Sequence, residues 1–212
     1  MLDRVNAMSD GVVAIALTLL VLSIEVPQSH DFTNGGLIAY LVKVEYQLTV
    51  YLVSFVLIGC YWVLQNVMFH YFRHGTRVLT WLNLLFLFLL TLLPLTTQLI
   101  GTYRDEPLVM VVYGAVSIAC SLSLALIWWY SNHIGMVVWP KIDPTVERTF
   151  MRRILYGACL SLVAVGVSFL NVRMSHFVFL SMPLLYLSDR QVDRHWSELV
   201  AANNGEVDGI DD

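Results

Sequence analysis

Charge is scarce in this chain of 212 residues. Asp, Glu, Lys and Arg make up 13% of it and hydrophobic residues 58%, whereas a soluble domain carries about 25% charged residues. This balance excludes a soluble globular protein and a disordered one. The net charge of −4 argues against nucleic-acid binding, which requires a basic face.

Motifs of catalysis and of common cofactors are also lacking. The sequence has no P-loop, no Gly-x-Gly-x-x-Gly and no Ser–His–Asp or paired-carboxylate arrangement, so we predict that the chain is not an enzyme and holds no cofactor or resident metal. His70 and His74 are four residues apart, but they lie among aromatic residues, which favours an interfacial role. The three cysteines lie within apolar runs, where thiols are usually buried.

Long hydrophobic runs fill most of the chain. A membrane helix needs about 20 apolar residues, and no β-barrel alternation occurs, so we predict an all-α membrane protein with six transmembrane helices. The runs are 5–26, 46–68, 78–103, a stretch within 108–131, 154–172 and 174–188. The last is the shortest. Residues 37–45 are expected to form a separate interfacial helix. Residues 1–200 would form the membrane domain, and 201–212 an acidic, disordered tail.

The basic residues predict the orientation of the chain. With the N-terminus inside, nine of the 12 Lys and Arg residues fall on inner segments, as the positive-inside rule requires. We therefore expect a multi-pass protein of the plasma membrane with both termini cytoplasmic. Trp128, Trp129 and Tyr130 are expected to anchor the inner end of the fourth helix at the membrane interface.

Polar residues stand at the base of the first helix. The charge-free run from Gly11 to Ile24 is about 21 Å long as a helix, which is short for a membrane core of about 30 Å. Either the helix is short, or Ser9 and Asp10 are drawn to membrane depth, where an ionisable group indicates a functional site. A helix N-cap is the alternative. Gln65, Asn66 and Asn83 are expected at the same depth as partners.

A single apolar seam runs along the first helix. At 100° per residue its members are Met8, Gly11, Ile15, Leu19, Leu22 and Val26, with Thr18 beside them. The spacing follows a heptad pattern, which suits identical helices meeting around an axis, although ordinary helix packing also produces such seams. Asp10 lies on the far side of the helix and should face its own subunit.

Two blocks of sequence resemble the transmembrane-protein-175 family of lysosomal and bacterial potassium-permeable channels. The first is Arg4-x-x-x-Met8-Ser9-Asp10-Gly11 with the apolar run up to Pro27, and the second is Tyr61-Trp62, Trp81–Leu87 and Pro94–Thr97. The family usually has phenylalanine at position 8, and histidine after Trp62, where this chain has Gln65 and Asn66.

The resemblance implies a homotetramer of six-helix subunits with the first helix lining a central pore. Carried over, the hydrophobic constriction falls on Ile15, Leu19 and Leu22, and Thr18 offers a ring of hydroxyl groups. A packing network at the inner ends of the helices would comprise Arg4, Ser9, Asp10, Trp62, Gln65 and Asn83.

These features predict a passive cation channel that prefers potassium modestly over sodium. The Thr-Val-Gly-Tyr-Gly filter is absent, so a narrow apolar neck would select by dehydration and gate by dewetting. Glu25, with Asp105 and Glu106, would concentrate cations at the outer mouth. The expected partners are further copies of the chain, the bilayer and permeant K⁺. The alternative is a secondary or proton-coupled cation transporter, against which the lack of an inverted repeat argues.

Overall fold

The regular elements that a computed structural model of the protein describes are all helices. The structure describes residues 2–24, 36–72, 74–103, 106–134 and 144–181. The elements are α1 (Leu2–Leu19), the 3₁₀ turn η1 (Leu20–Ser23), α2 (Gly36–His70), α3 (Arg77–Thr102), α4 (Pro107–His133), α5 (Pro144–Ser168) and α6 (Val172–Leu180).

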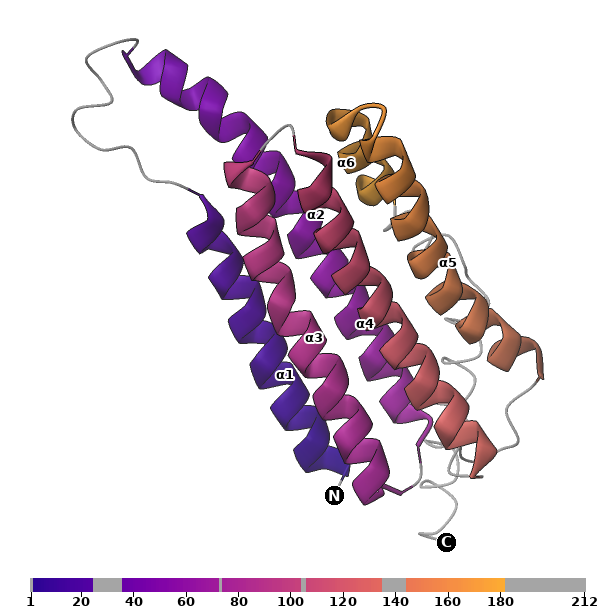
Figure 1. Cartoon of the computed structure of the whole chain (residues 1–212). Coiled ribbons are helices and arrows are strands. Elements are labelled where there is room, and N and C mark those ends of the chain that lie inside the picture. Colours follow the sequence, from indigo (N-terminus) through magenta and orange to yellow (C-terminus); the bar gives the residue numbers. More distant parts are fainter. Residues whose placement is uncertain (1, 25–35, 73, 104–105, 135–143, 182–212) are drawn as a thin grey trace, which may run out of the picture.

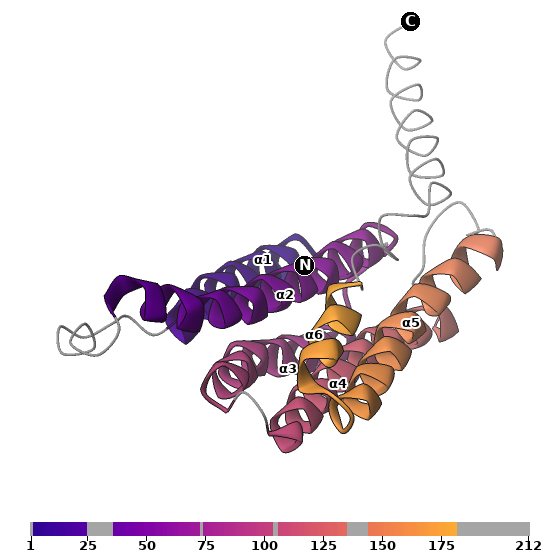
Figure 2. The ribbon, with the colours of Figure 1, turned by 90° about the horizontal axis from the view of Figure 1, so that it is seen from above.

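Helices α1 to α5 run alternately up and down in one bundle (Figure 1). We call the end at which α1 begins the inner end; α2 and α4 end there, and α3 and α5 begin there. The opposite end, which carries η1 and α6, is the outer end. Helix α1 packs on α2 and α3, whereas α5 packs on α4 and α6. Figure 2 shows α1 and α2 on one side of the bundle and α4 and α5 on the other.

Within the residues that the structure describes, five helices are long and apolar enough to cross a membrane, which confirms the first five predicted spans. The spans are Leu2–Ser23, Val44–His70, Arg77–Thr102, Pro107–His133 and Phe150–Ser168. Such helices suit a bilayer because each one satisfies its own backbone hydrogen bonds. The sixth predicted span is described only as far as Ser181, and α6 has 9 residues, too few to cross alone. The predicted tail, 201–212, lies outside the described residues.

Two predicted boundaries are wrong. The expected separate helix over 37–45 is the first part of α2, which continues without a break from Gly36 to His70. The first helix does not reach Val26 as an α-helix: it tightens into η1 at Leu20, and the backbone of Ile24 is extended, with φ −92° and ψ 115°. Val26 lies outside the described residues.

Hydroxyl groups join the helices in the middle of the bundle. The Tyr61 OH group of α2 is 2.8 Å from Ser117 Oγ of α4, which lies 2.9 Å from Ser161 Oγ of α5. Thr97 Oγ1 of α3 donates to Ser54 Oγ of α2 at 2.8 Å. These groups are buried, so each bond removes the cost of an unpaired polar group in an apolar medium.

Close helix contact also needs a small residue. At Gly114 of α4 an added Cβ atom would collide with the Val165 side chain of α5. Glycine therefore allows these two helices to approach, as small residues commonly do in membrane bundles.

Candidate functional site on the first helix

Helix α1 buries one side and leaves the other open. Ser9, Val13 and Ala16 are buried against the neighbouring helices α2 and α3. On the opposite side Ile15 is 60% exposed and Leu22, in η1, is 68% exposed. The other described members of the predicted seam are also exposed: Met8, Gly11 and Leu19. The seam thus lies on a face that the described part of the chain does not cover.

The open face is wider than the seam. Ala7, Ala14 and Val21 flank the seam on one side and are exposed as well. An added Cβ atom at Gly11 would meet no atom within 4 Å. Packing within the subunit therefore does not require glycine at that position.

Thr18 places a hydroxyl group on the same face. Its Oγ1 donates to the Ile15 carbonyl oxygen at 2.8 Å, and the residue is exposed. Because the hydroxyl proton is committed to the backbone, the oxygen lone pairs stay available as acceptors.

A chain of buried amide and hydroxyl groups ties α1 to α2 and α3 near the inner end. Gln65 Nε2 donates to Asn83 Oδ1 at 3.3 Å, and Asn83 Nδ2 donates to Ser9 Oγ at 2.9 Å. Ser9 Oγ in turn donates to the Val5 carbonyl at 2.9 Å. Gln65, Asn83 and Ser9 are each at most 1% exposed. The three side chains form one continuous path across three helices.

Asp10 makes a second link between α1 and α2. The Trp62 indole Nε1–H donates to Asp10 Oδ1 at 2.8 Å. Asp10 is not an N-cap, because α1 begins at Leu2, about 12 Å earlier along the helix axis. The carboxylate is turned toward its own subunit and away from the seam, although the residue remains exposed in the single chain.

The remaining predicted site residues stand apart from these links. Arg4 is exposed, and among the described residues it makes no hydrogen bond to Ser9 or Asp10. Asn66 offers its backbone carbonyl to His70 Nδ1 at 2.8 Å. Glu25 and Asp105 lie outside the described residues, and Glu106 is exposed at the start of α4.

Sequence reasoning missed the hydroxyl network of α2, α4 and α5 and misplaced one tryptophan. Serines at 117 and 121 recur at helical spacing in α4, which is the signal that would have indicated a polar seam between helices. Trp128 is not an interfacial anchor: it is fully buried, whereas its neighbour Trp129 is exposed.

Comparison with known proteins gives a consistent result. The model of the family described as endosomal/lysosomal potassium channel TMEM175 matches residues 4–94, which include α1 and its partners Trp62, Gln65 and Asn83. A potassium channel of Streptomyces collinus is 34% identical over 172 residues, covering 79% of this chain and 82% of the relative. One of Chamaesiphon minutus is 31% identical over 175 residues, covering 81% and 86%.

The fold agrees with that of a solved relative. The crystal structure of a lysosomal potassium-selective channel TMEM175 homologue from Chamaesiphon minutus superposes with a TM-score of 0.74 at 28% identity, covering 88% of this chain and 97% of the other. The matched family is one of ion channels and not of enzymes, in line with the lack of catalytic motifs. The chain therefore belongs to the TMEM175 family.

Proposed function

We propose that four copies of this chain form a potassium-preferring cation channel in the plasma membrane, with both termini cytoplasmic and with α1 lining the central pore. Family membership and the fold support a cation channel. The observation that carries the finer proposal is the open apolar face of α1. A span that buries only part of its surface in its own subunit needs lipid, a partner or water against the rest.

The neck of the pore would be built from Ile15, Leu19 and Leu22. Rings of such side chains repel water when narrow, so ions cross only when the neck widens enough to hydrate. An ion that enters loses part of its hydration shell. Sodium holds its water more strongly than potassium, so a dehydrating neck favours potassium without a ring of backbone carbonyls.

Thr18 would supply a polar ring beside Ile15. Its oxygen lone pairs, left available by the bond to the Ile15 carbonyl, replace part of the water that the ion loses. A single layer of hydroxyl groups compensates less than a multi-site carbonyl filter does. The proposed channel is therefore modestly selective. At the outer mouth Glu25 would raise the local cation concentration.

Two links hold α1 at a fixed rotation. The bond from Trp62 to Asp10 and the path from Gln65 through Asn83 to Ser9 both lie near the inner end. A helix fixed in this way keeps the seam on the side opposite α2 and α3. We assign these residues to positioning and assembly, together with Arg4, and not to contact with the permeant ion.

The tetramer is supported by the width of the open face. A seam that faces the pore axis occupies only part of the open face of α1. The flank formed by Ala7, Ala14 and Val21 can then contact the helix of a second copy. Small residues on such a flank, here Ala7 and Ala14, let helices approach closely. A closed ring of identical subunits then buries the same surface on every copy.

The proposal is tested with the purified chain in liposomes under a potassium gradient. A channel gives a current whose reversal potential follows the potassium gradient and shifts only partly when sodium replaces potassium. A secondary or proton-coupled transporter gives slow, saturable flux with a fixed co-ion ratio, and that result would replace the channel by the alternative. Empty liposomes serve as the control.

A further inference from the structure

Three spans meet in an aromatic cluster at the inner end, formed by Tyr71, Phe72, Trp128 and Phe150. Trp128 stacks on Phe150 with ring centroids 4.9 Å apart, and Tyr71 meets Trp128 edge-on at 6.4 Å. Tyr71 directly follows the second span, and Phe150 begins the fifth. The cluster therefore lies at the level where hydrocarbon gives way to lipid headgroups.

Polar atoms of Tyr71 and Trp128 in this cluster, and of Ser131 one helical turn from Trp128, are buried. Tyr71 OH, Trp128 Nε1 and Ser131 Oγ each expose less than 1 Å² and find no hydrogen-bond partner among the described residues. Ser131 lies three residues after Trp128, on the same face of α4. One unpaired buried donor costs about 1–3 kcal/mol, so three of them at the inner ends of α2 and α4 indicate a ligand that accepts hydrogen bonds. Burial raises the pKa of Tyr71, and its phenol therefore keeps the proton that it would donate.

One arginine lies on the cluster side of α5. Residues 147–153 hold three arginines and one acid. Arg153, half-buried, lies about 60° around the helix from Phe150 at 100° per residue, whereas Arg148 and Arg152 lie about 160° away and are exposed. Arg153 therefore adds a positive charge beside the three donors.

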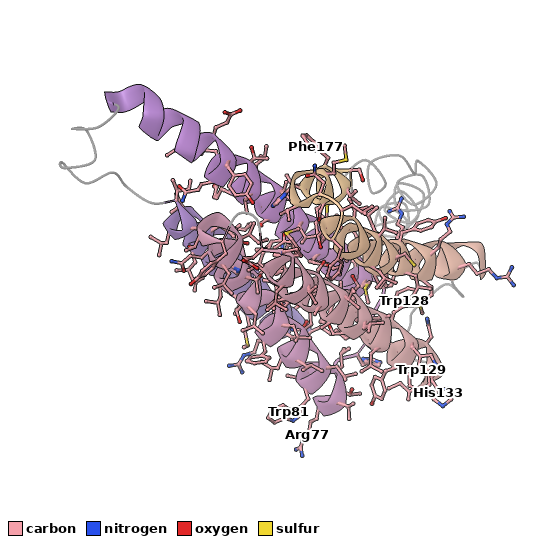
Figure 3. The ribbon with its side chains drawn as sticks, turned by 45° about the horizontal axis from the view of Figure 1, so that its top comes forward. Arg77, Trp81, Trp128, Trp129, His133 and Phe177 are labelled. Carbon is pink, nitrogen blue, oxygen red and sulfur yellow. The ribbon has the colours of Figure 1, made fainter. Side chains whose placement is uncertain are left out.

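An exposed indole indicates that the inner end of α4 lies at the membrane interface. Trp129 is exposed and stacks on His133, with ring centroids 5.4 Å apart and an interplanar angle of 10°. Figure 3 shows both at the end of α4, with Trp128 further back where α4 and α5 run side by side. Exposed tryptophans are typical of the headgroup region, so the buried donors lie at about the depth of lipid phosphate.

We propose that the inner ends of α2, α4 and α5 bind the phosphate of an anionic phospholipid, with Tyr71, Trp128 and Ser131 as neutral donors and Arg153 as the cation. Because the donors are covered in the described structure, the headgroup displaces a covering side chain as it binds. This site is separate from the face of α1 and does not depend on conduction.

The test is a titration of the purified, delipidated full chain in neutral detergent. The probes are short-chain phosphatidylglycerol, short-chain phosphatidylcholine and inorganic phosphate, and the readout is the midpoint of thermal unfolding. We expect phosphatidylglycerol to raise the midpoint at concentrations about tenfold lower than either of the other two, since it alone combines net charge, phosphate and acyl chain. Equal potency of phosphatidylcholine, or of inorganic phosphate, would refute a site for anionic lipid.

Variants test whether lipid binding depends on these hydrogen-bond donors or only on general electrostatic attraction. Tyr71→Phe with Ser131→Ala removes two hydroxyl groups and keeps the packing, so the apparent affinity for phosphatidylglycerol should fall about tenfold. The midpoint without lipid should hold or rise, because two unpaired groups are gone. An unchanged affinity in this variant would refute the assignment of the donors.

A matched pair of arginine variants tests the cation. Arg153→Gln should lower the apparent affinity for phosphatidylglycerol about tenfold, and Arg152→Gln less than threefold, although both substitutions remove one charge. Equal losses would show diffuse surface attraction and overturn the site. A fourth variant, in which the tail acids Glu206, Asp208, Asp211 and Asp212 become Gln or Asn, tests the chain's own carboxylates as occupants. Tighter lipid binding in that variant would assign the site to the tail.

Discussion

Helices α1 and α4 are both long apolar spans, yet they are used differently. In α1, 28% of the most apolar 18 residues are buried, and in α4 50% are. The polar side chains of α4 turn inward to other helices at Ser117 and Ser121, whereas α1 is tied to its subunit mainly near its inner end. Hydropathy alone does not distinguish a helix that is buried within the subunit from one that leaves an apolar face open. In this pair of helices the position of the buried polar groups does.

Substitutions of two isoleucines give the strongest test of this difference between α4 and α1. Ile127 of α4 is fully buried, and Ile15 of α1 is 60% exposed. Ile127→Asn removes packed volume and buries an amide without partners, so the folded state should lose about 3 kcal/mol or more. The measurement is the thermal unfolding midpoint and the yield of folded chain after size-exclusion chromatography. A stable, well-folded Ile127→Asn protein would contradict the central place of α4.

The same substitution at Ile15 should act on conduction instead. In Ile15→Asn the neck carries amides that hold water, so the current should rise by about threefold or more and the preference for potassium should weaken. The midpoint of unfolding should stay close to that of the unmodified chain. Single-channel or liposome currents under potassium and sodium measure the effect. An unchanged current with unchanged ion preference would remove Ile15 from the proposed neck.

The sequence predicted the first five spans because their apolar runs are long, and helical runs in a bilayer have few alternatives. It also predicted that Gln65 and Asn83 lie near the depth of Ser9. It did not predict the burial of Trp128. Two adjacent tryptophans are typical of a membrane-interface anchor, but they lie about 100° apart on a helix and can therefore face different surroundings. The tightening of α1 into η1 and the continuity of α2 also escaped prediction. The 3₁₀ turn η1 packs on α2 and α3, and such contacts cannot be read from local composition.

Asp10 tests the links at the inner end. Asp10→Ala leaves the Trp62 indole N–H without its acceptor, so the assembled channel should lose about 1–2 kcal/mol. Size-exclusion chromatography at increasing temperature measures the fraction of assembled protein. Asp3→Ala is the matched control, because Asp3 is also an exposed acid of α1. A fully assembled Asp10→Ala channel with altered ion preference would move Asp10 from positioning to permeation.

The smallest effect is expected from a substitution of Thr18 that removes only its hydroxyl group. Thr18→Val keeps the shape of the side chain and removes only the hydroxyl oxygen that a partly dehydrated ion would meet. The potassium-to-sodium permeability ratio should therefore fall by about twofold, with no change in the unfolding midpoint. Thr91→Val is the matched control, because Thr91 of α3 is exposed and its Oγ1 donates to the Phe88 carbonyl at 2.7 Å, as Thr18 does to Ile15. If both variants shift the ratio equally, the effect comes from the helix backbone. If neither does, the apolar neck selects alone.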